Sequence, residues 1–295
     1  TSVNRADLQQ RSGNYAPPPG ESEVLGLEVA GLIEQLGEGV TGWQVGDRVI
    51  TLVGGGGYAE YATAPASTLM PVPQGIDLVR AAGISEVFIT AYLNVFREAA
   101  LGPGETLLVH GGASGVGTAA IQLARALGPS PVIATVGSEA KALACKELGA
   151  DHVILYKQED FAERVLALTD RRGADVILDH IGAAYLEPNL RCLAPYGRLV
   201  IIGLLGGAKA ELNIGRLMVK RQRIIGSVLR ARPVAEKAAI TAAFREAALD
   251  RFARGELKPV IHEVLPLAEA RRAHELIAAN ANIGKVILQV DPSLT

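Results

Sequence analysis

The middle of the chain alternates short apolar runs with segments whose apolar residues recur at helical spacing. The apolar runs predict six strands, over residues 106–110, 132–136, 152–155, 175–178, 198–202 and 223–229. The helical patterns that separate most of them cover residues 117–127, 139–148, 159–169 and 185–193. Strands that alternate with helices of this length form βαβ units, so the pattern predicts an α/β fold with a doubly wound, parallel, six-stranded sheet.

Both ends of the chain carry a different pattern. Up to about residue 85 the sequence is rich in Gly and Pro, and its short β-type runs lie at 26–37, 47–53 and 58–65. Short runs between turn residues predict an irregular, β-rich domain, and a helical stretch near 86–100 follows it.

After residue 232 the pattern predicts a long helix, a short strand, a second helix and a final strand, at 233–254, 260–264, 267–279 and 284–290. This tail is too small to fold alone, so we expect it to complete the β-domain that begins at Thr1. The predicted domains are a discontinuous β-rich domain of residues 1–86 and 233–295 and a dinucleotide-binding domain of residues 87–232.

Residues 105–128, ETLLVHGGASGVGTAAIQLARALG, predict a strand, a glycine-rich turn and an alanine-rich helix. In the turn, the spacing Gly112-x-Ser114-x-x-Gly117 is the dinucleotide fingerprint with Ser at its middle glycine. Glycines let backbone and anion approach closely, and the first N–H groups of the helix have no internal partners. The alternative is a tight strand-to-helix turn without a ligand. The residues predicted to bind a cofactor here are Gly112, Ser114, Gly115, Val116 and Gly117.

The residues downstream of the turn indicate which nucleotide binds. In NAD-binding proteins an acidic residue about 20 positions past the turn bonds the ribose 2′-hydroxyl. About 20 residues past Gly117 no carboxylate ends the strand, whereas hydroxyls and a cation, which hold a 2′-phosphate, are present. We therefore predict NADPH, contacted by Gly137, Ser138, Lys141 and Tyr156. The alternative is that Lys141 is a solvated helix lysine and that Glu139 turns toward the ribose.

Composition and charge exclude several classes of function. The 295 residues carry a net charge of −2, so no basic field argues for nucleic acid or an anionic membrane. No apolar run approaches the roughly 20 residues of a membrane span. The two cysteines, Cys145 and Cys192, make no disulfide framework, and we expect a cytoplasmic protein. The chain starts at Thr1 without an initiator Met, so we expect that an amino-terminal segment is missing.

Several motifs together point to one known family: NRADLQQRSGNYAPPPG, GLEVAG, HGGASGVGTAAIQLA, YKQEDF and NIGK. Over nearly the whole chain they resemble the quinone oxidoreductase branch of the medium-chain dehydrogenases/reductases. The resemblance implies a GroES-like catalytic domain built from both chain ends, with the active site in the cleft between it and the nucleotide domain.

Zinc-dependent members of that family carry a Cys, a His and a Cys or Asp as catalytic ligands, together with a lobe of four cysteines. By the resemblance, the first Cys falls in the region of Asn4, and the family's Gly-His-Glu reads Gly26-Leu27-Glu28. Zinc needs thiolate, imidazole or carboxylate ligands that converge tetrahedrally. Two cysteines cannot form the lobe, and the five histidines lack ligand spacing, so we predict no metal at either site.

Without a Lewis acid the better substrates are already electron-poor: quinones, or C=C bonds conjugated to a carbonyl. The protein then chiefly positions the reactants and supplies a hydrogen-bond donor for the reduced oxygen. Tyr15, in the SGNY that resembles the family's active-site loop, is the candidate donor, because a phenol stays protonated at neutral pH. The alternative is an ordinary loop aromatic that packs on residues 17–19.

The resemblance also implies contacts near the nicotinamide. Asn4, from the pattern N-x-x-D, approaches the nicotinamide and joins Tyr15 as a predicted catalytic residue, whereas Asp7 fixes the loop through local hydrogen bonds. Ser114 points toward the cofactor or caps the helix. His180 is expected to satisfy local hydrogen bonds rather than to act as an acid. Further predicted cofactor contacts are Thr90, Gly203, Leu204, Leu205 and Asn282.

These features predict an NADPH-dependent quinone reductase. An NADPH-dependent enoyl or alkenal (enone) reductase is the alternative enzyme, and an NADPH-binding protein with a structural or sensing role is a third hypothesis. The sixth strand, residues 223–229, is apolar and lies at the sheet edge, so a homodimer through it is expected, as in the resembled family.

Overall fold

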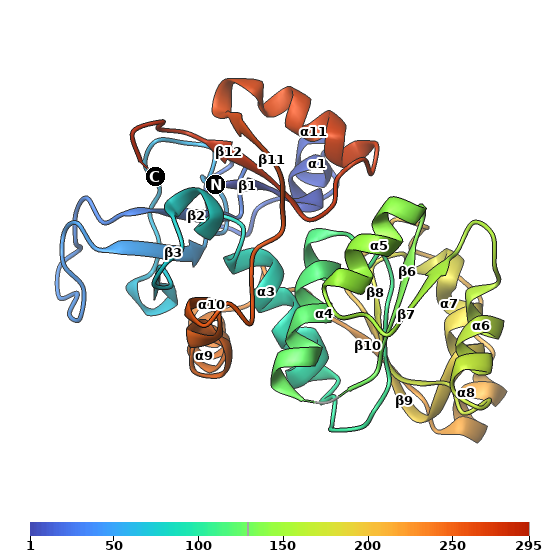
Figure 1. Cartoon of the computed structure of the whole chain (residues 1–295). Coiled ribbons are helices and arrows are strands. Elements are labelled where there is room, and N and C mark those ends of the chain that lie inside the picture. The colour runs from blue at the N-terminus through green and yellow to red at the C-terminus, as the bar shows by residue number, and fades with distance from the viewer. Residues whose placement is uncertain (129, 295) are drawn as a thin grey trace. The chain divides into compact units, whose positions relative to one another are not determined.

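The computed structural model describes residues 1–128 and 130–294; Pro129 and Thr295, which fall within the predicted domain ranges, lie outside the described part of the chain. The fold divides the chain into two compact units (Figure 1). We call them the terminal unit, Thr1–Ile89 with Leu229–Thr295, and the central unit, Thr90–Val228.

A parallel sheet forms the middle of the central unit. Its strands are β5 (Leu107–Val109), β6 (Val132–Val136), β7 (His152–Leu155), β8 (Ala174–Asp179), β9 (Leu193–Ile201) and β10 (Arg223–Gly226). Their order is β10-β9-β8-β5-β6-β7, and every neighbouring pair is parallel. The chain runs outward from β5 in one direction and from β8 in the other, so the carboxyl ends of these two strands flank the switch point. The predicted doubly wound, six-stranded parallel sheet is confirmed.

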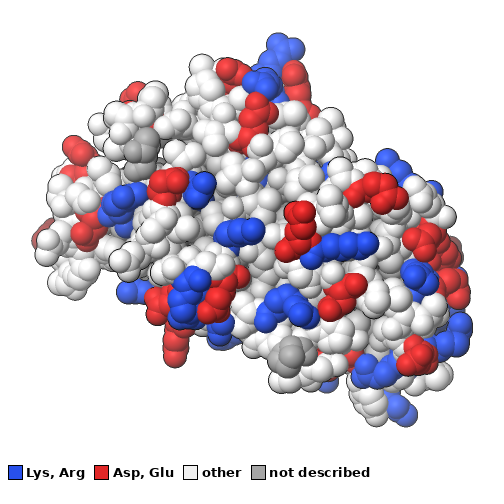
Figure 2. All heavy atoms as spheres, viewed as in Figure 1, with Lys and Arg blue, Asp and Glu red and all other residues white. Residues whose placement is uncertain are grey.

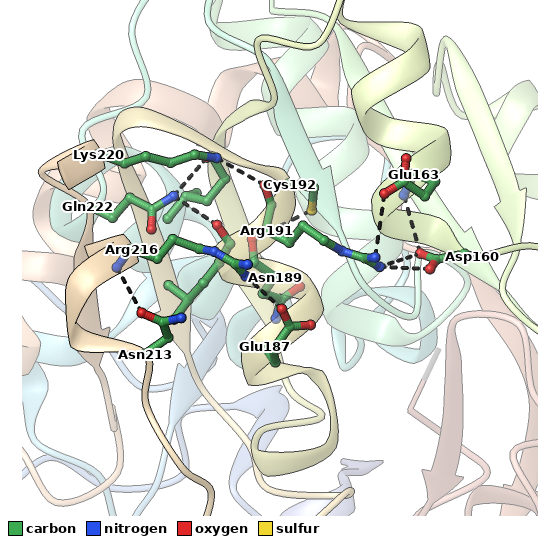
Figure 3. Close-up of polar contacts among 12 residues, drawn as sticks. Asp160, Glu163, Glu187, Asn189, Arg191, Cys192, Asn213, Arg216, Lys220 and Gln222 are labelled. Atoms are coloured by element: carbon green, nitrogen blue, oxygen red, sulfur yellow. Dashed lines mark hydrogen bonds and ion pairs between the residues drawn. The ribbon is translucent and has the colours of Figure 1, made fainter. Parts of the chain in front are cut away.

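Helices of the central unit follow the predicted pattern closely. They are α4 (Gly115–Leu127), α5 (Glu139–Glu147), α6 (Phe161–Leu168) and α7 (Leu186–Cys192), together with a π-helical segment, η2 (Leu93–Glu98), and a short 3₁₀ helix, η3 (Ala183–Tyr185). Helix α4 begins at Gly115 rather than at residue 117, because the Ser114 hydroxyl caps it. Asp160 caps α6 by accepting from the Ala162 N–H (2.9 Å), and Arg191 of α7 donates to the same carboxylate (2.7 Å; Figure 3).

Helix α8 (Ile214–Lys220) has no counterpart among the predicted helices. Its polar residues face the rest of the central unit: Arg216 pairs with Glu187 (2.6 Å), and Lys220 donates to the Leu193 carbonyl (2.9 Å; Figure 3). Its apolar side chains are largely exposed, namely Ile214 (69%), Met218 (70%) and Val219 (70%). Leu217 packs against the core of the central unit, so α8 has one inward apolar contact and an exposed apolar face made of the other three residues.

The terminal unit contains two three-stranded sheets. The first has the order β1-β12-β11, made of β1 (Ser2–Val3), β11 (Ile261–Pro266) and β12 (Lys285–Gln289). The second is antiparallel with the order β2-β3-β4, made of β2 (Glu28–Leu32), β3 (Arg48–Leu52) and β4 (Met70–Pro71). Because β12 pairs with β1, a late strand completes a sheet that the first residues begin.

The terminal unit differs from the predicted pattern at residues 58–65, which form no strand. The Tyr58 N–H donates to the Leu25 carbonyl (2.8 Å), and the Tyr58 phenol turns inward toward a buried carboxylate. Tyr61, on the same run, is 74% exposed. The alternating pattern therefore reflects one anchored aromatic residue rather than a sheet face.

The helices of the terminal unit are α1 (Arg5–Arg11), α2 (Leu78–Ala81), α9 (Val234–Phe244), α10 (Asp250–Ala253) and α11 (Ala270–Ala278), with short turns η1 (Ala66–Thr68) and η5 (Leu267–Glu269). Helix α3 (Ser85–Tyr92) begins in this unit and ends in the first residues of the central unit. Helix α1 replaces the expected loop: N-x-x-D is part of a capping box, in which Asp7 accepts from the Asn4 N–H (2.7 Å). The predicted helix at 233–254 forms as one continuous helical run, in which a π-helical segment, η4 (Arg245–Leu249), lies between α9 and α10.

Charged side chains of both signs lie interspersed on the face seen in Figure 2. Within the described residues, no helix combines the length and the apolar character that crossing a bilayer requires.

Candidate functional site

The glycine turn after β5 leaves no room for side chains. Gly111 has a positive φ of 58°, and a Cβ on Gly112 would lie 2.7 Å from the Ala134 Cβ. A Cβ on Gly117 would lie 2.4 Å from the Gly111 carbonyl oxygen, so α4 packs directly against the backbone of the turn. Close contact of helix and turn is the role that the last glycine of a dinucleotide fingerprint serves.

The amino end of α4 keeps donors for an anion. Ser114 caps the helix, because its hydroxyl accepts from the Gly117 N–H at 3.0 Å. Capping was one of the two roles predicted for this residue. Gly115 and Val116 occupy the first turn, where N–H groups have no intrahelical partner. These groups and the helix dipole provide the chemistry of a phosphate site.

A buried network ties together the strand ends beneath this turn. His110, directly after β5, contacts the Thr135 hydroxyl through Nδ1 (3.0 Å) and the Asn189 Oδ1 through Nε2 (2.7 Å). Asn189 in turn donates to Asp179 at the end of β8 (3.2 Å), which also accepts from the Gly182 N–H (3.1 Å). The carboxyl ends of β5, β6 and β8 are thereby held at fixed spacing below the glycine turn.

The protonation states of this network follow from burial. Burial lowers the pKa of His110 to about 3, so its ring is neutral and Nε2–H donates to Asn189 while Nδ1 accepts from Thr135. Burial also raises the pKa of Asp179 to about 6. Sequence reasoning missed His110 and Asp179, although their position at the carboxyl ends of buried strands was a usable signal.

The residues predicted to hold a 2′-phosphate follow β6 and β7, which are neighbours in the sheet. Gly137 and Tyr156 lie together, because a Cβ on Gly137 would be 3.0 Å from the Tyr156 hydroxyl oxygen. Ser138 precedes α5 with its side chain exposed and not engaged as a cap, and Lys141 lies in the first turn of that helix. The structure adds Lys157, whose Cε lies 3.5 Å from the same Cβ position.

The loop after β9 lies against the loop after β8. A Cβ on Gly203 would be 3.0 Å from the His180 Cβ, and the Leu205 N–H donates to the His180 carbonyl (3.2 Å). Leu204 and Leu205 are 57% and 49% exposed. His180 also borders the glycine turn, because its Nε2 lies 2.3 Å from where a Cβ on Gly111 would be.

Thr90 carries a buried hydroxyl without a hydrogen-bond partner in the described part of the chain. Its carbonyl accepts from Asn94 Nδ2 (2.8 Å), so the backbone is satisfied while the side chain is not. A buried polar atom left without a partner is uncommon and suits a site that a ligand completes. With the glycine turn and the exposed hydroxyl of Ser138, this orphaned group makes the central unit fit a dinucleotide.

In the terminal unit Asn4 lies in a buried polar network with Glu28 and Lys285. Lys285 Nζ donates to Asn4 Oδ1 (2.6 Å) and forms an ion pair with Glu28 Oε1 (3.1 Å), and Asn4 Nδ2 donates to the same oxygen (3.2 Å). Ser2 also hydrogen-bonds to Glu28. The side chains of Glu28 and Lys285 are 1% and 4% exposed, so the pair is shielded from solvent.

Asp7 is fully buried and joins three segments of the terminal unit. It accepts from the Gly26 N–H (3.1 Å) and from the Tyr58 hydroxyl (3.2 Å), which also contacts His274 Nε2 (3.0 Å). Burial raises the pKa of Asp7, and burial also raises that of Tyr58. Asp7 thus ties α1 to more distant segments, beyond the local hydrogen bonds that were predicted for it.

Tyr15 is half-buried and is held by Arg230. The Arg230 guanidinium lies 5.1 Å from the centre of the Tyr15 ring and donates to the Tyr15 carbonyl (3.3 Å). The same guanidinium donates to Gly54 O (2.7 Å) and Gln10 Oε1 (2.8 Å). Arg230, which sequence reasoning did not single out, therefore fixes the loop that carries the predicted donor.

Asn282 uses its side chain locally. Its Nδ2 donates to the Gly284 carbonyl (2.7 Å) and so holds the turn that precedes β12. The side chain is half-buried, and its predicted contact with a cofactor stays a prediction.

The residues present do not fit a zinc ion. Among the residues that the structure describes, no three side chains of His, Cys, Asp or Glu gather as metal ligands. Asn4 and Leu27 offer neither thiolate nor imidazole. Burial raises the pKa of both Cys145 and Cys192 to about 12, so both stay as thiols at neutral pH.

Comparison with known proteins gives consistent similarities across the chain. Residues 1–74 match the family model described as alcohol dehydrogenase GroES-like domain, and residues 115–248 match the one described as zinc-binding dehydrogenase. The chain is 37% identical over 291 residues to a quinone oxidoreductase of Pseudomonas aeruginosa, covering 97% of this chain and 87% of the relative.

Two further similarities concern a second enzyme and a solved structure. The chain is 33% identical over 299 residues to a 2-haloacrylate reductase of a Burkholderia species, covering 97% of this chain and 87% of the relative. It is also similar to the crystal structure of Escherichia coli quinone oxidoreductase complexed with NADPH, with a TM-score of 0.85 and 30% identity. That similarity covers 97% of this chain and 88% of the other.

Proposed function

Because the chain belongs to the quinone oxidoreductase branch of the medium-chain dehydrogenase/reductase family, we propose that it is an NADPH-dependent quinone reductase. The observation that carries this proposal is the glycine turn that opens α4 at the switch point of the parallel sheet. NADPH, when bound, supplies a hydride. The protein's own residues bind the nucleotide, orient the acceptor and stabilise the reduced oxygen.

The central unit offers residues for each part of the nucleotide. The N–H groups of Gly115 and Val116 suit the pyrophosphate, beside the backbone of Gly112 and Gly117. The orphaned Thr90 hydroxyl suits the nicotinamide amide. The remaining proposed contacts are Gly137, Ser138, Lys141, Tyr156 and Lys157 for the 2′-phosphate, and Gly203, Leu204, Leu205, Asn4 and Asn282 for the nicotinamide half.

We propose further that catalysis proceeds without zinc, with Tyr15 and Asn4 as the catalytic residues. Without a metal, the acceptor must delocalise negative charge itself, which quinones do and simple ketones do not. Burial raises the pKa of Tyr15, so its phenol keeps its proton and donates a hydrogen bond to the developing oxyanion. Activity that survives exhaustive treatment with a chelator is the expected result, and its loss, with recovery on adding zinc, would refute a metal-free reaction.

An enone reductase is the second candidate, and the similarity to a 2-haloacrylate reductase favours it. A C=C bond conjugated to a carbonyl places negative charge on an oxygen after hydride addition, as a quinone does. Both reactions therefore use the same donor at that oxygen.

The test is a substrate panel with NADPH: 1,4-naphthoquinone, an α,β-unsaturated ketone and a 2-haloacrylate. We expect the highest kcat/KM with the quinone. A higher kcat/KM with the enone or the haloacrylate would replace the proposal by the second candidate. Tight NADPH binding without NADPH oxidation by any acceptor would point to a binding or sensing role instead.

We also propose a homodimer through β10. In the described residues β10 pairs only with β9, and Ile224 and Val228 are 36% and 51% exposed. The outward apolar face of α8 lies just before this strand in the chain. An unpaired apolar edge pairs readily with a second copy about a two-fold axis.

Light scattering at micromolar concentration tests the dimer. We expect twice the monomer mass for the wild type and a monomer for Ile224→Lys, which places like charges opposite each other across the two-fold axis. Leu143→Lys, at a 61% exposed position on α5, is the matched control and should stay dimeric. A monomeric wild type would contradict the proposal.

A further inference from the structure

The loop that follows β9, residues 203–207, is hydrogen-bonded along its length to the loop that follows β8, residues 180–184. The loops also pack closely, since a Cβ on Gly182 would lie 2.8 Å from the Gly207 carbonyl oxygen. A displacement of one loop therefore displaces the other. The backbone donor–acceptor pairs are Leu205 N with His180 O (3.2 Å), Gly206 N with Ile181 O (2.6 Å), Ala183 N with Gly207 O (2.9 Å) and Ala184 N with Gly206 O (3.3 Å).

Asp179, the last residue of β8, ties both loops to the sheet. Its carboxylate accepts from the Ile181 N–H through Oδ1 (2.6 Å) and from the Gly182 N–H through Oδ2 (3.1 Å). Its backbone carbonyl accepts from the Ile202 N–H (2.7 Å), directly before the second loop. Each loop therefore starts at a hydrogen bond to this one residue.

Buried side chains hold the Asp179 carboxylate from the other side. Asn189 Nδ2, on α7, donates to its Oδ2 (3.2 Å), and Asn189 Oδ1 lies 2.7 Å from His110 Nε2. All three residues are fully buried, and His110 directly precedes Gly111 of the glycine turn. The carboxylate thus connects the two loops with the strand end that carries the phosphate-binding turn.

We propose that Asp179, oriented by Asn189, is a positioning residue for the nicotinamide half of NADPH. Through residues 180–184 it sets the place of residues 203–207 relative to the glycine turn. The inference rests on the proposed function, in which residues 203–205 contact the nicotinamide half. Asp179 is 0% exposed, so it acts on the nucleotide through these loops. The proposed contacts of the 2′-phosphate follow β6 and β7 and take no part in the loop pairing, so the role is confined to one half of the nucleotide.

Asp179→Asn weakens this anchor at nearly constant side-chain size. An amide has one accepting oxygen where the carboxylate has two. Whichever way the amide turns, its NH₂ group faces the N–H of either Ile181 or Gly182, which the wild-type carboxylate satisfies. A buried N–H without an acceptor is costly, so the loop shifts to satisfy it.

The matched control is Asp175→Asn, at the other end of the same strand. The Asp175 side chain is 3% exposed, and it accepts from the Thr106 N–H (2.8 Å) and from Arg172 (2.6 Å). The control therefore also loses hydrogen bonds of a buried carboxylate, but away from both loops. It separates a loss of stability from a loss of positioning.

The first test is calorimetric titration with NADPH and with 2′,5′-ADP, which lacks the nicotinamide half. We expect Asp179→Asn to weaken NADPH binding about tenfold and to change 2′,5′-ADP binding by less than about twofold. Asp175→Asn should keep the wild-type affinity for both. Equal losses for both ligands, no loss for either, or the same selective loss in Asp175→Asn would overturn the inference.

The second test is kcat at saturating NADPH with 1,4-naphthoquinone as acceptor. A reacting group that is displaced by about 1 Å costs about 10²-fold in rate, so kcat of Asp179→Asn should fall by up to about that factor even when the nucleotide site is full. Wild-type kcat in a variant with weakened NADPH binding would contradict positioning of the nicotinamide.

Asn189→Ala keeps the result interpretable if Asp179→Asn folds poorly. It leaves both loop N–H groups bonded to the carboxylate and removes only the donor that orients it. The same selective loss of NADPH affinity is expected, smaller in size, and a folded Asn189→Ala with wild-type affinity for both ligands would overturn the inference.

The two proposals fail differently. A wild type that binds neither NADPH nor 2′,5′-ADP refutes the nucleotide site, and with it the role of Asp179. A wild type that binds both, together with an Asp179→Asn variant that binds them equally well, refutes the role of Asp179 alone.

Discussion

Two charged residues, Lys285 and Glu28, fix the orientation of the Asn4 side-chain amide. Lys285 donates to the amide oxygen at 2.6 Å, and one amide N–H donates to Glu28 at 3.2 Å. The amide oxygen is thereby occupied by a cation, and a second N–H remains for a ligand. This arrangement supports the proposed role of Asn4 as a hydrogen-bond donor to the nicotinamide or to the acceptor oxygen.

Replacing Lys285 by Met should destabilise the terminal unit strongly. The substitution leaves Glu28, with a side chain that is 1% exposed, as an uncompensated buried charge. Losing one partner of a buried ion pair costs about 3–5 kcal/mol. Urea denaturation should show a loss of this size for Lys285→Met and a partial recovery for Lys285→Met with Glu28→Gln. Equal stability of the wild type and Lys285→Met would show that the pair contributes little.

Glu86 should make the stability of the protein depend on pH. Burial and the neighbouring Glu28 charge raise its folded pKa to about 8, above the usual 4.5, so between these values the folded state binds a proton that the unfolded state has released. Relative to the ionised form at high pH, protonated Glu86 stabilises the folded state. This contribution is fully present below about pH 4.5 and is lost as pH rises to about 8.

The comparison that reveals this dependence is between the wild type and Glu86→Gln, which cannot titrate. From pH 5 to 8 the free energy of unfolding of the wild type should fall relative to that of the variant, by at most about 1.4 kcal/mol per pH unit. Urea denaturation across that range measures it. Parallel curves would mean that Glu86 is ionised in the folded protein.

At the scale of elements, the turn before α4 is the most constrained part of the central unit. Gly117→Ala would place a Cβ 2.4 Å from the Gly111 carbonyl oxygen, so the helix or the turn must move. Overpacking of this kind costs about 1–3 kcal/mol, and the shift displaces the N–H groups that would face the phosphates. We expect NADPH affinity, measured by fluorescence titration, to fall about tenfold or more.

The control for this variant is Gly31→Ala in β2. A Cβ there meets no atom within 4 Å, and the residue has no positive φ. Its NADPH affinity should match that of the wild type. Wild-type affinity in Gly117→Ala as well would show that the turn does not hold the nucleotide.

Elements whose apolar residues face the core could be predicted from the sequence. The strands of the central sheet and the helices between them follow directly from their spacing. Helix α8 could not be predicted from the sequence. Its polar residues contact Glu187 and Leu193, while Ile214 and Met218 are exposed. The run at 58–65 has the alternation of a strand, but tertiary contacts of Tyr58 determine its course.

At the scale of the whole molecule, the candidate site was predictable where its residues form a local motif. The glycine turn has the close packing that its motif predicts, and the residues after β6 and β7 stay predicted contacts of the nucleotide. The network of Asn4, Glu28, Lys285 and the Glu86 backbone was not predictable, because its members come from segments far apart in the chain. Only the pairing of β1 with β12 and the packing around β2 bring them together.

The most direct test of the central claim is kcat/KM for NADPH against that for NADH, with 1,4-naphthoquinone as acceptor. The hydroxyls and lysines that follow β6 and β7 suit a 2′-phosphate, and no carboxylate ends β6 to bind a free 2′-hydroxyl. We predict rapid quinone-dependent oxidation with a clear preference for NADPH. Preference for NADH would contradict the assignment of the nucleotide, and absence of quinone-dependent oxidation with either nucleotide would contradict the account as a whole.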